Sequence, residues 1–102
     1  MIPRGTTPTL QLEIDDETLD LTTVNHVYVT LKNGNNVLTK KDADLTISEN
    51  SVALYLNQAE TLAMASDSTE VQVNWTFPDG SREATSIARV QIGKQLLMEV
   101  VP

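Results

Sequence analysis

The segment VQVNWTFPDGS, residues 71–81, decides the fold class of this chain. Its apolar residues alternate with polar ones, which is the two-residue period of a β-strand that buries one face. The Pro-Asp-Gly that follows is a strong turn signal, because proline fixes φ and glycine tolerates a positive φ. The segment therefore predicts a core strand that leads into a hairpin, with an inward row of Val71, Val73, Trp75 and Phe77.

The same alternation recurs along most of the chain. Asn33-Gly34-Asn35-Asn36 and Ser48-Glu49-Asn50-Ser51 each separate two alternating stretches, and each predicts a tight hairpin turn. The pair Lys40-Lys41 suits a strand near a sheet edge, where charge discourages stray pairing. Together with the core strand, seven strands are predicted, over residues 10–14, 27–32, 37–41, 45–47, 52–56, 71–77 and 82–92.

The last predicted strand, residues 82–92, contains an irregularity. Ile87 breaks the polar alternation of one face, and it predicts a β-bulge or a second contact surface at this point. The alternation predicts that the other face carries Ala84, Ser86, Ala88, Val90 and Ile92.

Residues 58–64 are the one stretch that predicts a helix. Asn57 can cap the first turn, and Glu60, three residues later, can reach back to complete a capping box. Ala59, Leu62 and Ala63 share one side at helical spacing, so we expect that side to cover the core where the chain crosses between sheets.

Short strands at spacings of about 8 to 12 residues, joined mainly by hairpins, are typical of an antiparallel β-sandwich. The predicted fold is all-β, an immunoglobulin-like sandwich of about seven strands with one short helix near residues 58–64. Residues 1–102 are expected to form a single domain. A small closed barrel fits the same strand pattern and stays open as an alternative.

The composition argues against several classes of partner. Fourteen Asp+Glu against seven scattered Lys+Arg give a formal net charge of −7, which argues against nucleic acid. The same acidity, with no apolar run of about 18 residues, argues against a membrane. The chain has no Cys, so disulfides, thiolate metal sites and cysteine nucleophiles are excluded. Residues 1–8 contain no apolar signal segment, so we expect residence in the cytoplasm.

The sequence contains no motif for catalysis or for a cofactor. His26 is the only histidine, and its parity with Tyr28 places it on an exposed face without an indicated nucleophile or orienting carboxylate. The acidic loop Asp15–Asp20 lacks the ligand spacing of a dedicated calcium loop, so we expect it to be solvated. The chain is therefore predicted to be non-enzymatic, with no cofactor and no metal.

Four segments carry a resemblance beyond their strand pattern: IPRGTTPTL (2–10), VYVTLK (27–32), LNQAETL (56–62) and VQVNWTFPDG (71–80). Together they resemble small phage and prophage proteins, over nearly the whole chain. Such proteins look like single immunoglobulin-like modules encoded among bacteriophage structural genes, and similar modules open some tail and baseplate proteins. The resemblance implies a virion or assembly protein, present in the bacterial host cytoplasm during assembly and a candidate part of the virion.

The two termini carry the predicted partner contacts. A sandwich offers strand edges to which another subunit can add a strand, and terminal segments often lie at such edges. We expect protein partners, either other phage structural subunits or a second copy, with packing of the termini on their own sheet as the alternative. A small sandwich that binds a carbohydrate or a divalent cation is the alternative function. The predicted contact residues are Ile2, Arg4, Leu97, Val100 and Val101.

Overall fold

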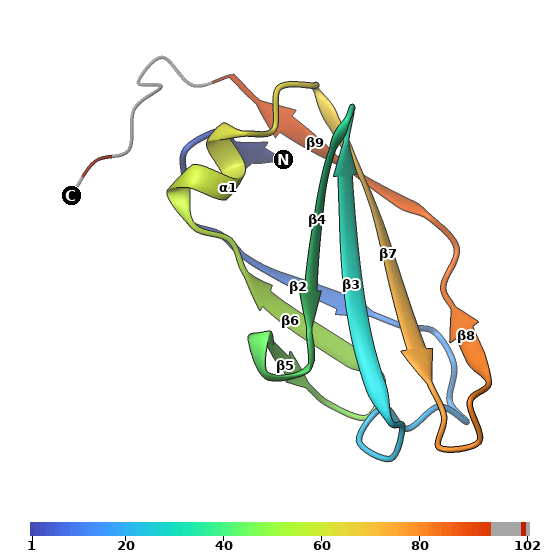
Figure 1. The fold of residues 1–102 in the computed structure, drawn as a ribbon. Helices are drawn as coiled ribbons and strands as arrows, with labels where there is room; N and C mark the ends of the chain where they lie inside the picture. The colour runs from blue at the N-terminus through green and yellow to red at the C-terminus, as the bar shows by residue number, and fades with distance from the viewer. Residues whose placement is uncertain (95–100, 102) are drawn as a thin grey trace.

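The computed structural model describes residues 1–94 and 101, and it shows two β-sheets packed against each other (Figure 1). The described residues contain nine strands: β1 (Ile2–Pro3), β2 (Thr9–Glu13), β3 (His26–Asn33), β4 (Asn36–Lys41), β5 (Leu45–Ile47), β6 (Ser51–Tyr55), β7 (Ser68–Thr76), β8 (Arg82–Ala84) and β9 (Ala88–Gly93). The larger sheet has the order β1-β9-β7-β3-β4, with β8 also paired to β7, and the smaller sheet has the order β2-β6-β5. The predicted all-β architecture of two packed sheets is thus confirmed.

Two features raise the strand count above the predicted seven. The first is β1, in which Ile2 and Pro3 pair in parallel with Ile92 and Gly93 of β9. Two residues are too few to show an alternation, so the sequence pattern could not indicate this strand. The second is the division of the predicted strand over residues 82–92 into β8 and β9.

A β-bulge separates β8 from β9 at the irregularity that Ile87 marks. Ala84 lies opposite Asn74 and Ala88 lies opposite Val71, so three residues of this strand face two residues of β7. One extra residue turns the following part of a strand over, because successive side chains point to opposite faces. The prediction of one continuous face along residues 82–92 is therefore wrong, since β8 and β9 are out of phase.

The predicted hairpin turns are confirmed, and glycine has a conformational role in two of them. Gly34, between β3 and β4, has a φ of 59°, and Gly80, between β7 and β8, has a φ of 89°. Residues with a Cβ rarely adopt this left-handed region. In the second turn, the Asp79 carboxylate also accepts a hydrogen bond from the Ser81 N–H at 2.8 Å.

One hydrophobic core lies between the sheets. Trp75 of β7 is 4% exposed, as its parity predicts, while Phe77 at the end of the row is only half-buried. The apolar side chains of the edge strand β2 are also half-buried, because β2 has a strand neighbour on one side only. The buried residues that the alternation predicts are Val27, Val29, Leu31, Val52, Leu54, Leu56, Val71, Val73, Trp75 and Ile92.

The predicted helix is present as α1 (Gln58–Leu62), shorter than the predicted range by two residues. Asn57 and Glu60 form both hydrogen bonds of the capping box, as predicted. The helix connects β6 of the smaller sheet to β7 of the larger one, so the predicted crossing is confirmed. A second helical turn, η1 (Asp42–Asp44), follows β4. Within the described residues, no helix is long and apolar enough to span a bilayer.

The prediction of which side of α1 faces the core is wrong. Ala59 and Ala63 are exposed, and within residues 58–64 the buried side chains are Thr61 and Met64. The Thr61 hydroxyl donates a hydrogen bond to the Thr6 carbonyl at 2.8 Å. A polar contact with the N-terminal segment therefore sets the orientation of this short helix, and apolar spacing does not reveal such a contact.

Candidate functional site

The predicted contact residues near the N-terminus, Ile2 and Arg4, are buried within their own chain. Ile2 is 3% exposed and pairs with Ile92, while Arg4 is 9% exposed. Arg4 Nε donates to the Met64 carbonyl at 2.6 Å, and its Nη2 donates to the Ala65 carbonyl at 2.9 Å. Their packing and donors are used inside the fold, as the alternative of termini packed on their own sheet predicts, and their contact with a partner stays a prediction.

The predicted contacts at the C-terminus have a different position. Val101 is 38% exposed, and its backbone N–H and carbonyl both bond to the Gln58 side chain of α1, at 2.8 Å and 2.7 Å. Leu97 and Val100 lie outside the described residues. Only Val101 of the predicted terminal contacts is thus seen at the surface.

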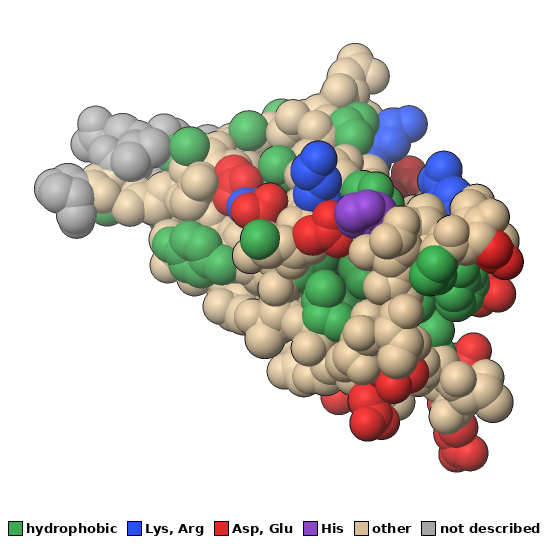
Figure 2. All heavy atoms as spheres, turned by 60° about the horizontal axis from the view of Figure 1, so that its bottom comes forward, with side chains coloured by type: hydrophobic (Ala, Val, Ile, Leu, Met, Phe, Trp, Pro, Cys, Tyr) green, Lys and Arg blue, Asp and Glu red, His purple; other side chains and the backbone are tan. Residues whose placement is uncertain are grey.

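His26 has an orienting carboxylate that the sequence did not indicate. His26 Nδ1 lies 2.9 Å from Asp42 Oδ2, and Asp42 Oδ1 accepts a hydrogen bond from the Val27 N–H at 3.0 Å. Figure 2 shows the histidine next to acidic side chains on the face in view. His26 and Asp42 line a surface hollow together with Thr22, whose hydroxyl donates a hydrogen bond to Asp20. Among the described residues, the His26–Asp42 pair therefore has no hydroxyl nucleophile bonded to it.

The acidic loop Asp15–Asp20 uses its carboxylates to hold its own turns. Asp16 Oδ1 accepts hydrogen bonds from the Thr18 hydroxyl at 2.7 Å and from the Thr18 N–H at 3.0 Å. These bonds hold the pKa of Asp16 below its ordinary value, so the carboxylate stays ionised. Asp20 accepts the corresponding bonds from Thr22. No three His, Asp or Glu side chains converge on a cation-sized site in the part of the chain that the structure describes.

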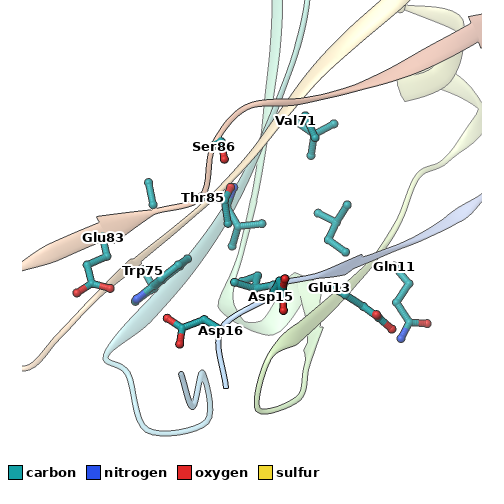
Figure 3. A pocket seen from close by; sticks show the side chains of 14 residues that line it. Gln11, Glu13, Asp15, Asp16, Val71, Trp75, Glu83, Thr85 and Ser86 are labelled. Atoms are coloured by element: carbon teal, nitrogen blue, oxygen red, sulfur yellow. The ribbon is translucent and has the colours of Figure 1, made fainter. Parts of the chain in front are cut away.

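A groove of about 550 Å³ opens between the edges of the two sheets, and we call it the acidic groove (Figure 3). One wall is formed by residues 11–16, the end of β2 and the loop after it. The other wall is formed by residues 83–86 and 88, from β8, the bulge and the start of β9. The groove is bounded between them by Val71, Val73 and Trp75 of β7.

The charge of this groove is one-sided. Four of its 14 lining residues are acidic, and none of the described residues that line it is Lys or Arg. The acidic lining residues are Glu13, Asp15, Asp16 and Glu83.

Trp75 brings an unpaired hydrogen-bond donor to the groove. Its indole Nε1 is buried and has no hydrogen-bond partner among the described residues. In Figure 3 the nitrogen end of the ring is turned toward the part of the groove where Asp16 and Glu83 lie. Buried donors are almost always paired in folded proteins, so this N–H is a donor that an occupant of the groove can use.

The backbone of β2 offers a free edge beside the groove. The Pro8 carbonyl accepts from the Leu56 N–H, and the Ile14 N–H donates to the Asn50 carbonyl, so even-numbered residues face β6. Successive residues of an antiparallel strand direct their backbone groups to opposite edges. The backbone groups of Thr9, Gln11 and Glu13 therefore point away from β6, to an edge that no described strand pairs.

Comparison with protein-family models, with curated proteins and with solved structures gives no match to this chain. The resemblance to phage and prophage proteins therefore stays a prediction.

The sequence pattern indicated one wall of the acidic groove and, through Ile87, the bulge beside the other wall, but not that the two walls face each other. It indicated the acidic loop with Asp15 and Asp16, and it marked Ile87 as a bulge or contact point. It missed Glu83, which the bulge places out of phase with β9 and on the groove. The break in alternation at Ile87 was the one signal that pointed to this part of the surface.

Replacing Arg4 with Ala is expected to lower the free energy of unfolding by about 2–4 kcal/mol, because the carbonyls of Met64 and Ala65 lose their donors. Arg4→Lys should recover part of this loss, since lysine keeps the positive charge but lacks the planar guanidinium group that reaches both carbonyls. Arg89→Ala, at an exposed position of β9, is the control and should change stability by less than about 0.5 kcal/mol. Urea unfolding followed by Trp75 fluorescence measures all three, and equal losses for Arg4→Ala and Arg89→Ala would contradict the role of Arg4.

Asp42 should make the stability depend on pH in the acid range. The hydrogen bond from the Val27 N–H, with a smaller contribution from His26, holds the pKa of Asp42 below its ordinary value of 3.8. Its stabilising contribution is therefore complete above pH 3.8 and is lost as the pH falls through the lowered pKa. Asp42→Asn keeps the acceptor and suits the positive φ of 45°, but it removes the charge.

Urea unfolding from about pH 6 to about pH 2 tests this prediction. Wild type should be the more stable protein at the upper end, and its advantage over Asp42→Asn should shrink as the pH falls below 3.8. An advantage that stays constant over this range would contradict it.

Proposed function

We propose that this chain is a non-enzymatic interaction module with an immunoglobulin-like arrangement of strands. The order β2-β6-β5 corresponds to strands B, E and D of an immunoglobulin domain, and β9-β7-β3-β4 corresponds to G, F, C and C′. In that arrangement a further strand commonly lies beside strand B. The position beside β2 is unpaired within the described residues.

The observation that carries this proposal is the unpaired edge of β2 beside the acidic groove. An exposed strand edge is a template for pairing with another chain, and natural proteins blunt such edges unless they use them. The outward residues Gln11 and Glu13 include no lysine or proline that would discourage pairing. The geometry therefore supports recognition of a protein through a sheet edge.

The resemblance to phage and prophage structural proteins supplies the setting of this proposal. We propose a protein of tail or baseplate assembly that is present in the bacterial host cytoplasm while particles form, and that is a candidate component of the virion. Its partners are other structural subunits. The unpaired edge of β2 indicates a protein partner, and the resemblance to phage proteins indicates that this partner is a structural subunit.

The alternative functions receive less support. The Trp75 ring is 4% exposed, so its face is closed to sugar stacking. Among the described aromatic side chains of Phe, Trp and Tyr, Tyr55 has the largest exposed fraction. The carboxylates of Asp16 and Asp20 bond to their own loop instead of converging on a cation. His26 and Asp42 lack a bonded nucleophile among the described residues, which favours a non-enzymatic role.

Site-directed photo-crosslinking in a phage-producing bacterial host, the setting that the proposal implies, tests the proposal. Benzoylphenylalanine replaces Gln11 on the edge of β2, Val37 on the edge of β4, or Tyr28 on the central strand β3 as the control. We expect adducts with a discrete structural protein from the edge positions, and the same adducts in purified particles. Edge positions that give no more adduct than Tyr28, together with absence of the chain from particles, would overturn the proposal.

A further inference from the structure

We propose that the acidic groove binds an extended, basic segment of a partner protein, which adds a strand to the free edge of β2. This inference rests on the proposed function and goes further by stating where the partner binds and what its chemistry is. It combines three independent features of the groove: a regular unpaired edge, an apolar wall with an unpaired donor, and a one-sided charge.

Two sheet edges border the groove, and the edge of β2 is the one that can pair with an added strand. β2 is a regular five-residue strand, and its outward backbone groups belong to Thr9, Gln11 and Glu13. The opposite edge is interrupted by the bulge between β8 and β9, and β1 covers its far end. Bulges disturb the register that a new strand needs, so pairing is expected at β2.

The apolar residues of the groove fit alternate side chains of an added strand. Leu12 and Ile14 of one wall are half-buried, and Val71, Val73 and Trp75 lie between the walls. A strand paired with β2 would direct every second side chain toward these residues. An oxygen acceptor from the same segment would satisfy the Trp75 Nε1 donor, which no residue in the described part of the chain pairs.

The charge of the groove selects a basic occupant. Glu13, Asp15, Asp16 and Glu83 line the groove, and no described lining residue carries a positive charge. Lys and Arg can place their aliphatic stems on apolar surface and keep their charged ends near carboxylates at the rim. A second copy of this chain is disfavoured as the occupant, because its net charge of −7 repels the same groove.

A synthetic peptide tests the inference on the full chain. The probe is a blocked peptide of about eight residues with alternating Val and Lys, long enough to cover the five residues of β2. Binding is followed by the fluorescence of Trp75, the only tryptophan, and by the amide NMR signals of Gln11 and Glu13. We expect saturable binding that weakens as salt is added.

Two control peptides separate charge from strand addition. A peptide of alternating Val and Glu should bind at least about tenfold more weakly, because it carries the charge of the groove. A Val-Lys peptide that is N-methylated along one edge loses the N–H groups that pair with β2, and it should also bind at least about tenfold more weakly.

A matched pair of double variants locates the site. Glu13→Gln with Glu83→Gln removes two charges from the groove and should weaken binding by about three- to tenfold. Asp44→Asn with Glu70→Gln removes two charges outside the groove and should leave binding within about twofold of wild type. All four side chains are at least partly exposed, so both variants are expected to fold.

Three results would overturn the inference: no saturable binding of the Val-Lys peptide, equal binding of the N-methylated peptide, or equal weakening by both double variants. Its failure is distinguishable from failure of the proposed function. Crosslinks from the edge of β4 with no peptide binding at the groove would leave the interaction module standing and remove this site.

Discussion

Burial of the inward row of β7 is the interaction on which the rest of the structure depends. β7 pairs with β3 on one side and with β8 and β9 on the other, so it is the centre of the larger sheet. Val71, Val73 and Trp75 pack toward the smaller sheet, and burying side chains of this size contributes about 1.5–3 kcal/mol each. The same three residues border the acidic groove, so the site shares its apolar surface with the core.

The open side of the sandwich follows from how its edges are covered. β1 covers β9 only at Ile92 and Gly93, and the chain then runs into β2 in the other sheet. No described strand therefore lies between the end of β2 and the opposite wall, which is formed by β8, the bulge and the start of β9. Backbone groups at such an edge must bond to water or to another chain, which links the architecture of the fold to its use as an interaction surface.

The sequence predicted the parts of the site that are local and missed those that depend on register. Asp15 and Asp16 are visible as an acidic loop, and Ile87 marks the bulge. The place of Glu83 depends on the phase of β8 relative to β9, which one extra residue reverses. The burial of Arg4 was not visible in the sequence for a similar reason, because its partners are carbonyls about 60 residues away in the chain.

The sequence by itself determined the strand alternation, the turns at Gly34 and Gly80, the capping box of α1 and the burial of Trp75. These features depend on side-chain period and local backbone preference, which neighbouring residues specify. Only the tertiary structure decided the pairing of β1 with β9, the His26–Asp42 contact and the meeting of β2 with β8 across the groove. Contacts between distant segments depend on how two sheets pack and where their edges end, and no local pattern encodes that geometry.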